Sequence, residues 1–135
     1  MIAPQDSSLL GLVSAIAPAL VTGNTVVVVA SESFPLAAID LAEVLATSDV
    51  PGGVVNILTG SPAEIAPWLA SHADVNALDL VGAGALDWIE LQIAAAETLK
   101  RVLPPENGPD AATPSIDRIV AFTETKTVWH TKGLI

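Results

Sequence analysis

Apolar residues recur along this chain with two alternating spacings, one typical of helices and one typical of buried strands. Residues 9–20 carry leucine, valine and isoleucine at helical spacing, with Ser7 or Ser8 as a candidate N-cap. Residues 25–30 form a continuous, mostly β-branched run, which is typical of a strand buried on both faces. Residues 2–4 are interpreted as the end of an earlier strand. We therefore predict strand, helix and strand in this opening part of the chain.

The same alternation continues as far as residue 102. Pro35 is placed to begin a second helix that runs to about Thr47. Its predicted inward residues are Ile39, Leu41, Val44 and Leu45. Further on, the pattern predicts a buried strand over 54–58, a helix over 62–72, a strand over 77–81 and a long helix over 84–102. Trp68 and Trp88 are predicted in or near the core. This order predicts an α/β fold, a Rossmann-like parallel sheet with helices on both faces.

The end of the chain has a different character. Residues 104–114 are rich in proline, with glycine and asparagine, and cannot sustain a regular element. Residues 114–122 are interpreted as a short helix and residues 125–130 as a strand that reaches out to pair with a partner. The predicted organisation is therefore a domain over residues 1–108, followed by a linker, helix and strand over 109–135.

Composition and charge exclude several classes of function. The chain has 135 residues, enough for one domain with its own core, and its net charge of −10 opposes nucleic-acid binding. It contains no cysteine, which excludes disulfides, thiolate metal sites and thiol catalysis. His72 and His130 lie far apart and lack companion ligands, so no metal site is expected. The longest uncharged stretch is broken by Pro18 and Gly23, so we expect no membrane span and a cytoplasmic protein.

Four blocks carry a family resemblance. They are IAPALVTGNTVV over residues 16–27, PGGVVNILTG over 51–60, LKRV over 99–102 and TETKTV over 123–128. The first three resemble the coenzyme-binding half of aldehyde dehydrogenases, and the fourth resembles the strand at that family's C-terminus, which crosses the subunit interface. The chain is thus similar to an aldehyde dehydrogenase whose catalytic domain is missing, like the C-terminal pseudo-domain of tandem aldehyde dehydrogenases.

The resemblance implies that the catalytic residues are absent. The family uses a cysteine nucleophile, and this chain has none. Asp6 occupies the position of the asparagine that stabilises the oxyanion, where a carboxylate would repel developing negative charge. Pro105 occupies the position of the general-base glutamate. We therefore expect a non-catalytic relative of the family.

The coenzyme site that the resemblance implies is also degraded. Glu32 is kept where the family grips the adenosine ribose, whereas Val29 replaces the lysine of that motif. Pro4, Gly60 and Gly82 complete the candidate cofactor-binding residues. The alternative interpretation is a solvated carboxylate beside glycines that only permit tight turns. We expect no bound cofactor, with weak binding of NAD or NADP as the alternative.

The C-terminal strand supplies the candidate interface residues, Thr125, Thr127, Val128 and Trp129. Trp129 could anchor a subunit contact, or the strand could fold back onto its own domain. The predicted partner is a second copy of this chain or an aldehyde dehydrogenase. The first hypothesis for function is thus a structural or oligomerisation module. The alternatives are a residual NAD(P)-binding subunit of an aldehyde oxidoreductase that needs a partner for catalysis, and a fragment of a longer protein.

Overall fold

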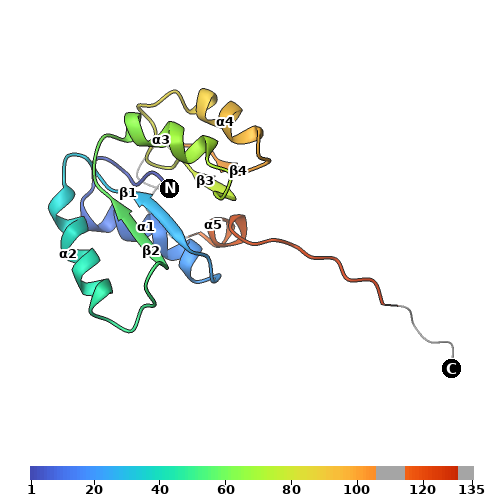
Figure 1. Cartoon of the computed structure of the whole chain (residues 1–135), viewed down its shortest axis with the longest axis horizontal. Helices are drawn as coiled ribbons and strands as arrows, with labels where there is room; N and C mark the ends of the chain where they lie inside the picture. The colour runs from blue at the N-terminus through green and yellow to red at the C-terminus, as the bar shows by residue number, and fades with distance from the viewer. Residues whose placement is uncertain (106–114, 131–135) are drawn as a thin grey trace.

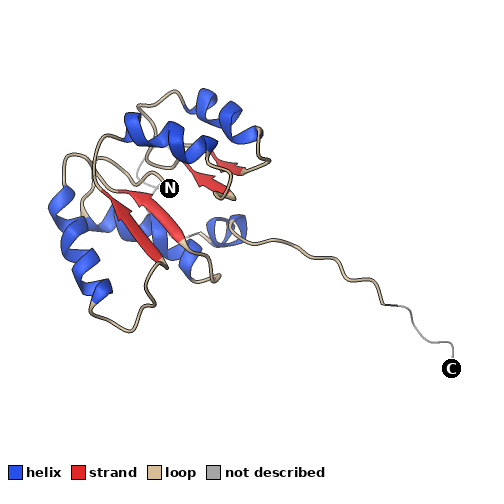
Figure 2. Ribbon diagram, in the orientation of Figure 1, coloured by secondary structure: helices blue, strands red, loops and turns tan. Residues whose placement is uncertain are grey.

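Parallel strands lie at the centre of the molecule, with helices on either side of them (Figure 1; Figure 2). The computed structural model describes residues 1–105 and 115–130. In chain order the elements are α1 (Leu9–Leu20), β1 (Val26–Val29), α2 (Pro35–Ala46), β2 (Val55–Leu58), α3 (Pro62–Ser71), β3 (Ala77–Asp79), α4 (Trp88–Ala96), β4 (Arg101–Leu103) and α5 (Ile116–Ala121). The alternation of helices and strands that the apolar spacing predicts is confirmed as far as α4.

The first three residues join two strand pairs into one sheet. β1 pairs in parallel with β2, and β3 pairs in parallel with β4. Between these pairs, the backbone N–H of Ala3 donates to the carbonyl of Val29 at 3.0 Å, and the N–H of Ile2 donates to the carbonyl of Asp79 at 2.9 Å. The order across the sheet is therefore β2, β1, residues 1–3, β3 and β4. The prediction that residues 2–4 end a strand is confirmed by the parallel bridge between Ile2 and Val29.

Helices cover both faces of this sheet, and each face has its own core. On one face α1 and α2, together with Phe122 after α5, pack against Val26 and Val28. On the other face α3 and α4 pack against Val29 and Leu78. Because successive side chains of β1 point to opposite faces, one buried strand serves both cores. The predicted α/β class with helices on both faces is confirmed.

Local side-chain chemistry explains where the helices begin. Ser8 is the N-cap residue of α1 but its side chain makes no capping bond, and the hydroxyl of Ser7 instead accepts from the N–H of Gly11 at 2.9 Å. α2 and α3 each begin with a proline, whose missing N–H costs nothing in the first turn. In α4 the carboxylate of Asp87 accepts from the N–H of Glu90 at 3.2 Å. These signals are local, and the serine before α1 and the proline that begins α2 were predicted from the sequence.

The prediction of one long helix over 84–102 is wrong. α4 ends at Ala96, and Leu99 adopts a left-handed conformation with φ of 55°. Leu99 is 92 % exposed, so it does not continue the apolar face that suggested a longer helix. The chain then enters β4, which stops at Leu103 directly before two prolines. A short strand at the rim of the sheet tolerates prolines that a central strand would not.

Several burial predictions are also wrong. Ile39 and Val44 are 44 % and 62 % exposed, and Trp68 is 76 % exposed. β2 alternates between half-buried and exposed residues instead of being buried throughout. The reason is position: β2 lies at the rim of the sheet and α2 packs over it, so part of the apolar surface of both has no neighbour. Trp88 packs against the second core, as predicted.

Residues 115–130 contain the predicted short helix but form no strand in a single chain. α5 lies within the predicted span 114–122. Residues 123–130, here called the C-terminal arm, follow it in an extended path that leaves the body of the molecule (Figure 1). The predicted domain boundary at residue 108 and most of the predicted linker lie outside the described residues.

Candidate functional site

The predicted cofactor residues all follow the carboxyl ends of parallel strands. Glu32 follows β1, Gly60 follows β2 and Gly82 follows β3, while Pro4 follows the strand-like segment 1–3. Parallel strands place these turns along the same rim of the sheet, called here the carboxyl edge. The structure brings Pro4 and Gly82 into direct contact, whereas Gly60 lies beyond β1 on the β2 side.

Gln5 ties the first turn of the carboxyl edge to the turn after β1. Its side-chain carbonyl accepts from the backbone N–H of Glu32 at 2.9 Å, and its amide donates to the carbonyl of Ala3 at 2.7 Å. The hydroxyl of Ser31 donates to the backbone carbonyl of Gln5 at 2.8 Å. The backbone at Glu32 is therefore held in place while its side chain is exposed to solvent. Gln5 was not among the predicted site residues, because its role depends on a contact with residues far along the chain.

Gly82 is required by strand packing. A Cβ at this position would lie 2.0 Å from the carbonyl oxygen of Ala3 and 2.6 Å from the nitrogen of Pro4. The N–H of Gly82 donates to the carbonyl of Ile2 at 3.0 Å, which holds the two backbones at this close separation. A glycine here is therefore explained without a pyrophosphate, since only hydrogen fits between the strands.

The other two positions of the degraded coenzyme motif also have structural explanations. Gly60 has φ of 143°, a backbone conformation that L side chains rarely adopt. The side chain of Val29 is fully buried in the second core, so this position presents neither charge nor hydrogen-bond donor to the carboxyl edge. The exposed carboxylates that remain at this edge include those of Glu32 and Asp6, and the glycines of the turns serve the backbone.

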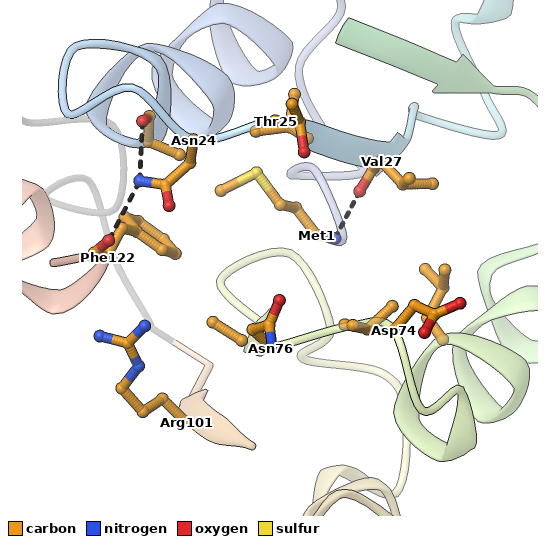
Figure 3. Close-up of a pocket in the computed structure, with 13 residues that line it drawn as sticks. Met1, Asn24, Thr25, Val27, Asp74, Asn76, Arg101 and Phe122 are labelled. Atoms are coloured by element: carbon orange, nitrogen blue, oxygen red, sulfur yellow. Dashed lines mark hydrogen bonds between the residues drawn. The ribbon is translucent and has the colours of Figure 1, made fainter. Parts of the chain in front are cut away.

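A cavity of about 190 Å³ lies at the opposite rim, the amino edge of the sheet (Figure 3). Its labelled lining residues are Met1, Asn24, Thr25, Val27, Asp74, Asn76, Arg101 and Phe122. The α-ammonium of Met1 donates to the carbonyl of Val27 at 2.7 Å within it. Burial lowers the pKa of this ammonium to about 6, although the carboxylate of Asp79 opposes that shift. The sequence motifs point to the carboxyl edge and gave no signal for this cavity.

Four contacts anchor the base of the C-terminal arm beside this cavity. Arg118 of α5 forms an ion pair with Asp79 of β3 at 2.7 Å, and both side chains are buried. The amide of Asn24 donates to the carbonyl of Phe122 at 3.0 Å, and the Phe122 ring is buried in the first core. Arg101 of β4 donates to the carbonyl of Thr123. The arm therefore leaves the body from a fixed point.

The predicted interface residues lie on this arm and are exposed. Thr125, Thr127, Val128 and Trp129 are all classed as exposed, and Trp129 is 91 % exposed. Residues 123–130 form no assigned strand in the single chain. A segment becomes a strand when its backbone forms hydrogen bonds with a neighbouring strand, and residues 125–130 have no such neighbour within the described part of the single chain. The predicted pairing of these residues with a partner therefore stays a prediction. The alternative, in which Trp129 packs on its own domain, is not what the structure contains.

The described residues contain neither a metal-binding cluster nor a membrane-spanning helix. No three His, Asp or Glu side chains come together there as metal ligands would. Within residues 1–105 and 115–130, no helix is long and apolar enough to cross a membrane.

Comparison with known proteins agrees with the resemblance seen in the blocks. The mitochondrial aldehyde dehydrogenase of Leishmania tarentolae is 38 % identical over 101 residues, which are 75 % of this chain and 20 % of that protein. This chain therefore spans about a fifth of the length of that relative.

Two solved structures have a similar fold. The betaine aldehyde dehydrogenase of Staphylococcus aureus, a point mutant in complex with NAD+, aligns with a TM-score of 0.63 and 27 % identity over 75 % of this chain and 20 % of its own. An aldehyde dehydrogenase from Bartonella henselae aligns with a TM-score of 0.63 and 32 % identity over 75 % of this chain and 21 % of its own. The model of the aldehyde dehydrogenase family matches residues 1–111. The family match over most of the chain, together with the parallel sheet covered by helices on both faces, shows that the chain belongs to the aldehyde dehydrogenase family.

Proposed function

We propose that this chain is a non-catalytic aldehyde-dehydrogenase-like domain that acts as a structural module and associates through its C-terminal arm. The observation that carries this proposal is the contrast between the two parts of the arm. Its base is anchored by Arg101 and Asn24, whereas Val128 and Trp129 are 62 % and 91 % exposed. An exposed segment that is rich in β-branched residues can pair with the strand edge of another chain.

Three features of the sequence support the absence of catalysis. There is no cysteine to act as the nucleophile. Asp6 and Pro105 stand where the family has its oxyanion amide and its general base. Asp6 is exposed just before the start of α1, and Pro105 follows the last residue of β4 by two positions. We infer that neither residue supplies the missing chemistry.

The test is the mass of the native assembly. We expect the full chain to form an oligomer and the chain lacking residues 125–135 to be a monomer, measured by native mass spectrometry and light scattering. A matched control replaces Leu99, which is 92 % exposed but outside the arm, with serine and should leave the oligomer intact. Equal masses for the full and the shortened chains would contradict the proposal.

A second candidate function is supported by Glu32 at the carboxyl edge, where nucleotides bind in such sheets. In this alternative the chain is an NAD(P)-binding subunit that needs a partner to supply the nucleophile and base. The lysine missing at Val29 removes a charge-assisted hydrogen bond worth about 1.5–3 kcal/mol, so binding would be weak. Calorimetry with millimolar NAD and NADP tests it, and absence of heat with both coenzymes would reject it.

A further inference from the structure

We propose that the C-terminal arm of one copy adds as a strand to the free edge of β2 in a second copy. This inference rests on the proposed function, since it names the surface that receives the arm. Among the described residues β2 pairs with β1 alone. An unpaired strand edge offers backbone donors and acceptors to an incoming chain.

The ladder defines which backbone groups of β2 are offered. Val26 donates to the carbonyl of Val54 and Ala30 donates to the carbonyl of Leu58, so even-numbered residues of β2 face β1. Since successive residues of a strand turn their peptide groups to opposite sides, the N–H and C=O groups of Val55 and Ile57 face outward. β2 therefore presents a short ladder that is not interrupted by proline between residues 54 and 60.

The helix that packs over β2 exposes both apolar and acidic side chains. α2 packs over β2 and exposes Ile39 and Val44 together with the carboxylates of Asp40 and Glu43. Leu58 of β2, which points to the opposite face of the sheet from Ile57, is 38 % exposed. A strand added here would meet an apolar side chain on each face and negative charge on the α2 side.

The arm has the complementary pattern. In an extended segment Lys126, Val128 and His130 share one face, and Thr125, Thr127 and Trp129 share the other. With the first face turned to the α2 side of the sheet, Val128 and Lys126 would lie on the side where α2 exposes apolar residues and carboxylates. The second face would place Trp129 near Leu58. Residues 125–130 contain no acidic side chain, whereas residues 1–105 carry eleven acidic residues against two basic ones, so the arm is attracted to the body of a partner.

The anchoring of the arm explains why the receiving edge belongs to a second copy. Arg101 of β4 holds the carbonyl of Thr123 and lies 3.9 Å from the carboxylate of Glu124. β4 and β2 are at opposite ends of the sheet order, and the arm leaves the body on the side away from β2 (Figure 1). The arm of a chain is thus directed away from its own β2 and toward a neighbour.

Cross-linking tests the receiving edge, because a chain without cysteine accepts single cysteines cleanly. One preparation carries Thr127→Cys in the arm and a second, isotopically labelled preparation carries Leu58→Cys. The two are mixed and treated with a short bismaleimide. We expect cross-linked heterodimers to form roughly tenfold faster or more than with the control Ile93→Cys, which is 63 % exposed on α4, because a docked arm has a high local concentration.

The outcomes separate this inference from the proposed function. Preferential cross-linking to Leu58→Cys supports the β2 edge. Equal rates for Leu58→Cys and Ile93→Cys overturn it, and if the full chain still loses its oligomer on deletion of residues 125–135, the proposed function stands. A full chain that is monomeric at every concentration overturns both. Native mass spectrometry verifies that the Ile93→Cys control leaves association unchanged. Weaker association of Leu58→Cys alone, with Ile93→Cys unaffected, would itself support the β2 edge.

Discussion

The guanidinium of Arg118 donates to the carboxylate of Asp79 at 2.7 Å, although 39 positions separate the two residues in the chain. Their side chains are 7 % and 1 % exposed. The other oxygen of Asp79 accepts from the N–H of Val81 at 2.9 Å, which fixes the carboxylate at the end of β3. The pair therefore fastens α5, and with it the base of the arm, to the middle of the sheet.

We predict that Arg118→Met destabilises the fold strongly. Removing one partner leaves a buried carboxylate without its counter-charge, which costs about 3–5 kcal/mol. Urea unfolding followed by circular dichroism measures the loss. The control is the same substitution in an Asp79→Asn background, where the amide oxygen still accepts from Val81 but the charge is gone. The loss there should be clearly smaller, and equal losses in the two backgrounds would show that the ion pair is not the cause.

We predict that Gly82→Ala also destabilises the fold, without any ligand being involved. The added methyl group would lie 2.0 Å from the carbonyl oxygen of Ala3, so the backbones of two neighbouring strands must separate. Overpacking of this kind costs about 1–3 kcal/mol, and a backbone clash puts it at the upper end. Thermal and urea unfolding give the measurement.

Gly52 supplies the matched control for that substitution. A Cβ there has no atom within 4 Å, and the backbone does not require glycine. Gly52→Ala is expected to be neutral or to stabilise by about 0.4–1 kcal/mol, because it reduces the freedom of the unfolded chain. If Gly82→Ala were as harmless as Gly52→Ala, the close approach of residues 1–3 to Gly82 would be contradicted.

A polypeptide that starts at Met1 should become more stable as the pH rises from about 6 to 8. Burial lowers the pKa of the α-ammonium from 8.0 to about 6, so between these values the unfolded chain binds more protons than the folded one. Raising the pH then favours folding. A shift of this size corresponds to about 2–3 kcal/mol, which is gained above pH 8 and absent below pH 6.

Acetylation of the α-amino group isolates this effect from other titrations. The acetylated chain has no amino proton to lose, so its free energy of unfolding should lack the rise between pH 6 and 8. The measurement is urea unfolding at several pH values for both forms. Identical pH profiles for the two forms would show that the buried ammonium contributes nothing.

Charge exchange tests the contact that we propose between the arm and α2. Lys126→Glu should weaken self-association, because it replaces attraction to the Asp40 and Glu43 carboxylates with repulsion. An exposed pair is worth about 0.2–1 kcal/mol, so each lost contact corresponds to a change of up to about fivefold in the dissociation constant. Sedimentation equilibrium at low salt measures this change.

The reciprocal variant is the control for charge exchange. Glu43→Lys in the Lys126→Glu chain should restore much of the lost affinity, and raising the salt concentration should reduce the difference between variants. Failure of Glu43→Lys to restore association would place the arm elsewhere on the partner.

Most of the features that could be predicted from the sequence depend on interactions between residues close together in the chain. The continuous valine run, the prolines that begin α2 and α3 and the serine near the start of α1 act within a few residues, so the element order as far as α4 and the two-faced α/β class were predictable. The blocks around residues 16–27 and 51–60 likewise indicated the family, since they are local strings. The candidate residues at the carboxyl edge came from the family resemblance, and the predicted strand order placed them at the ends of parallel strands.

Only the tertiary structure decided which apolar faces are covered and what the glycines are for. α2 and β2 show the apolar spacing of covered elements, but they lie at the rim of the sheet and leave Ile39 and Val44 exposed. The need for glycine at position 82 comes from Ala3, and the partner of Arg118 lies on β3. Periodicity reports which residues prefer burial, whereas burial and pairing depend on neighbours that are distant in the sequence and become close only when the chain folds.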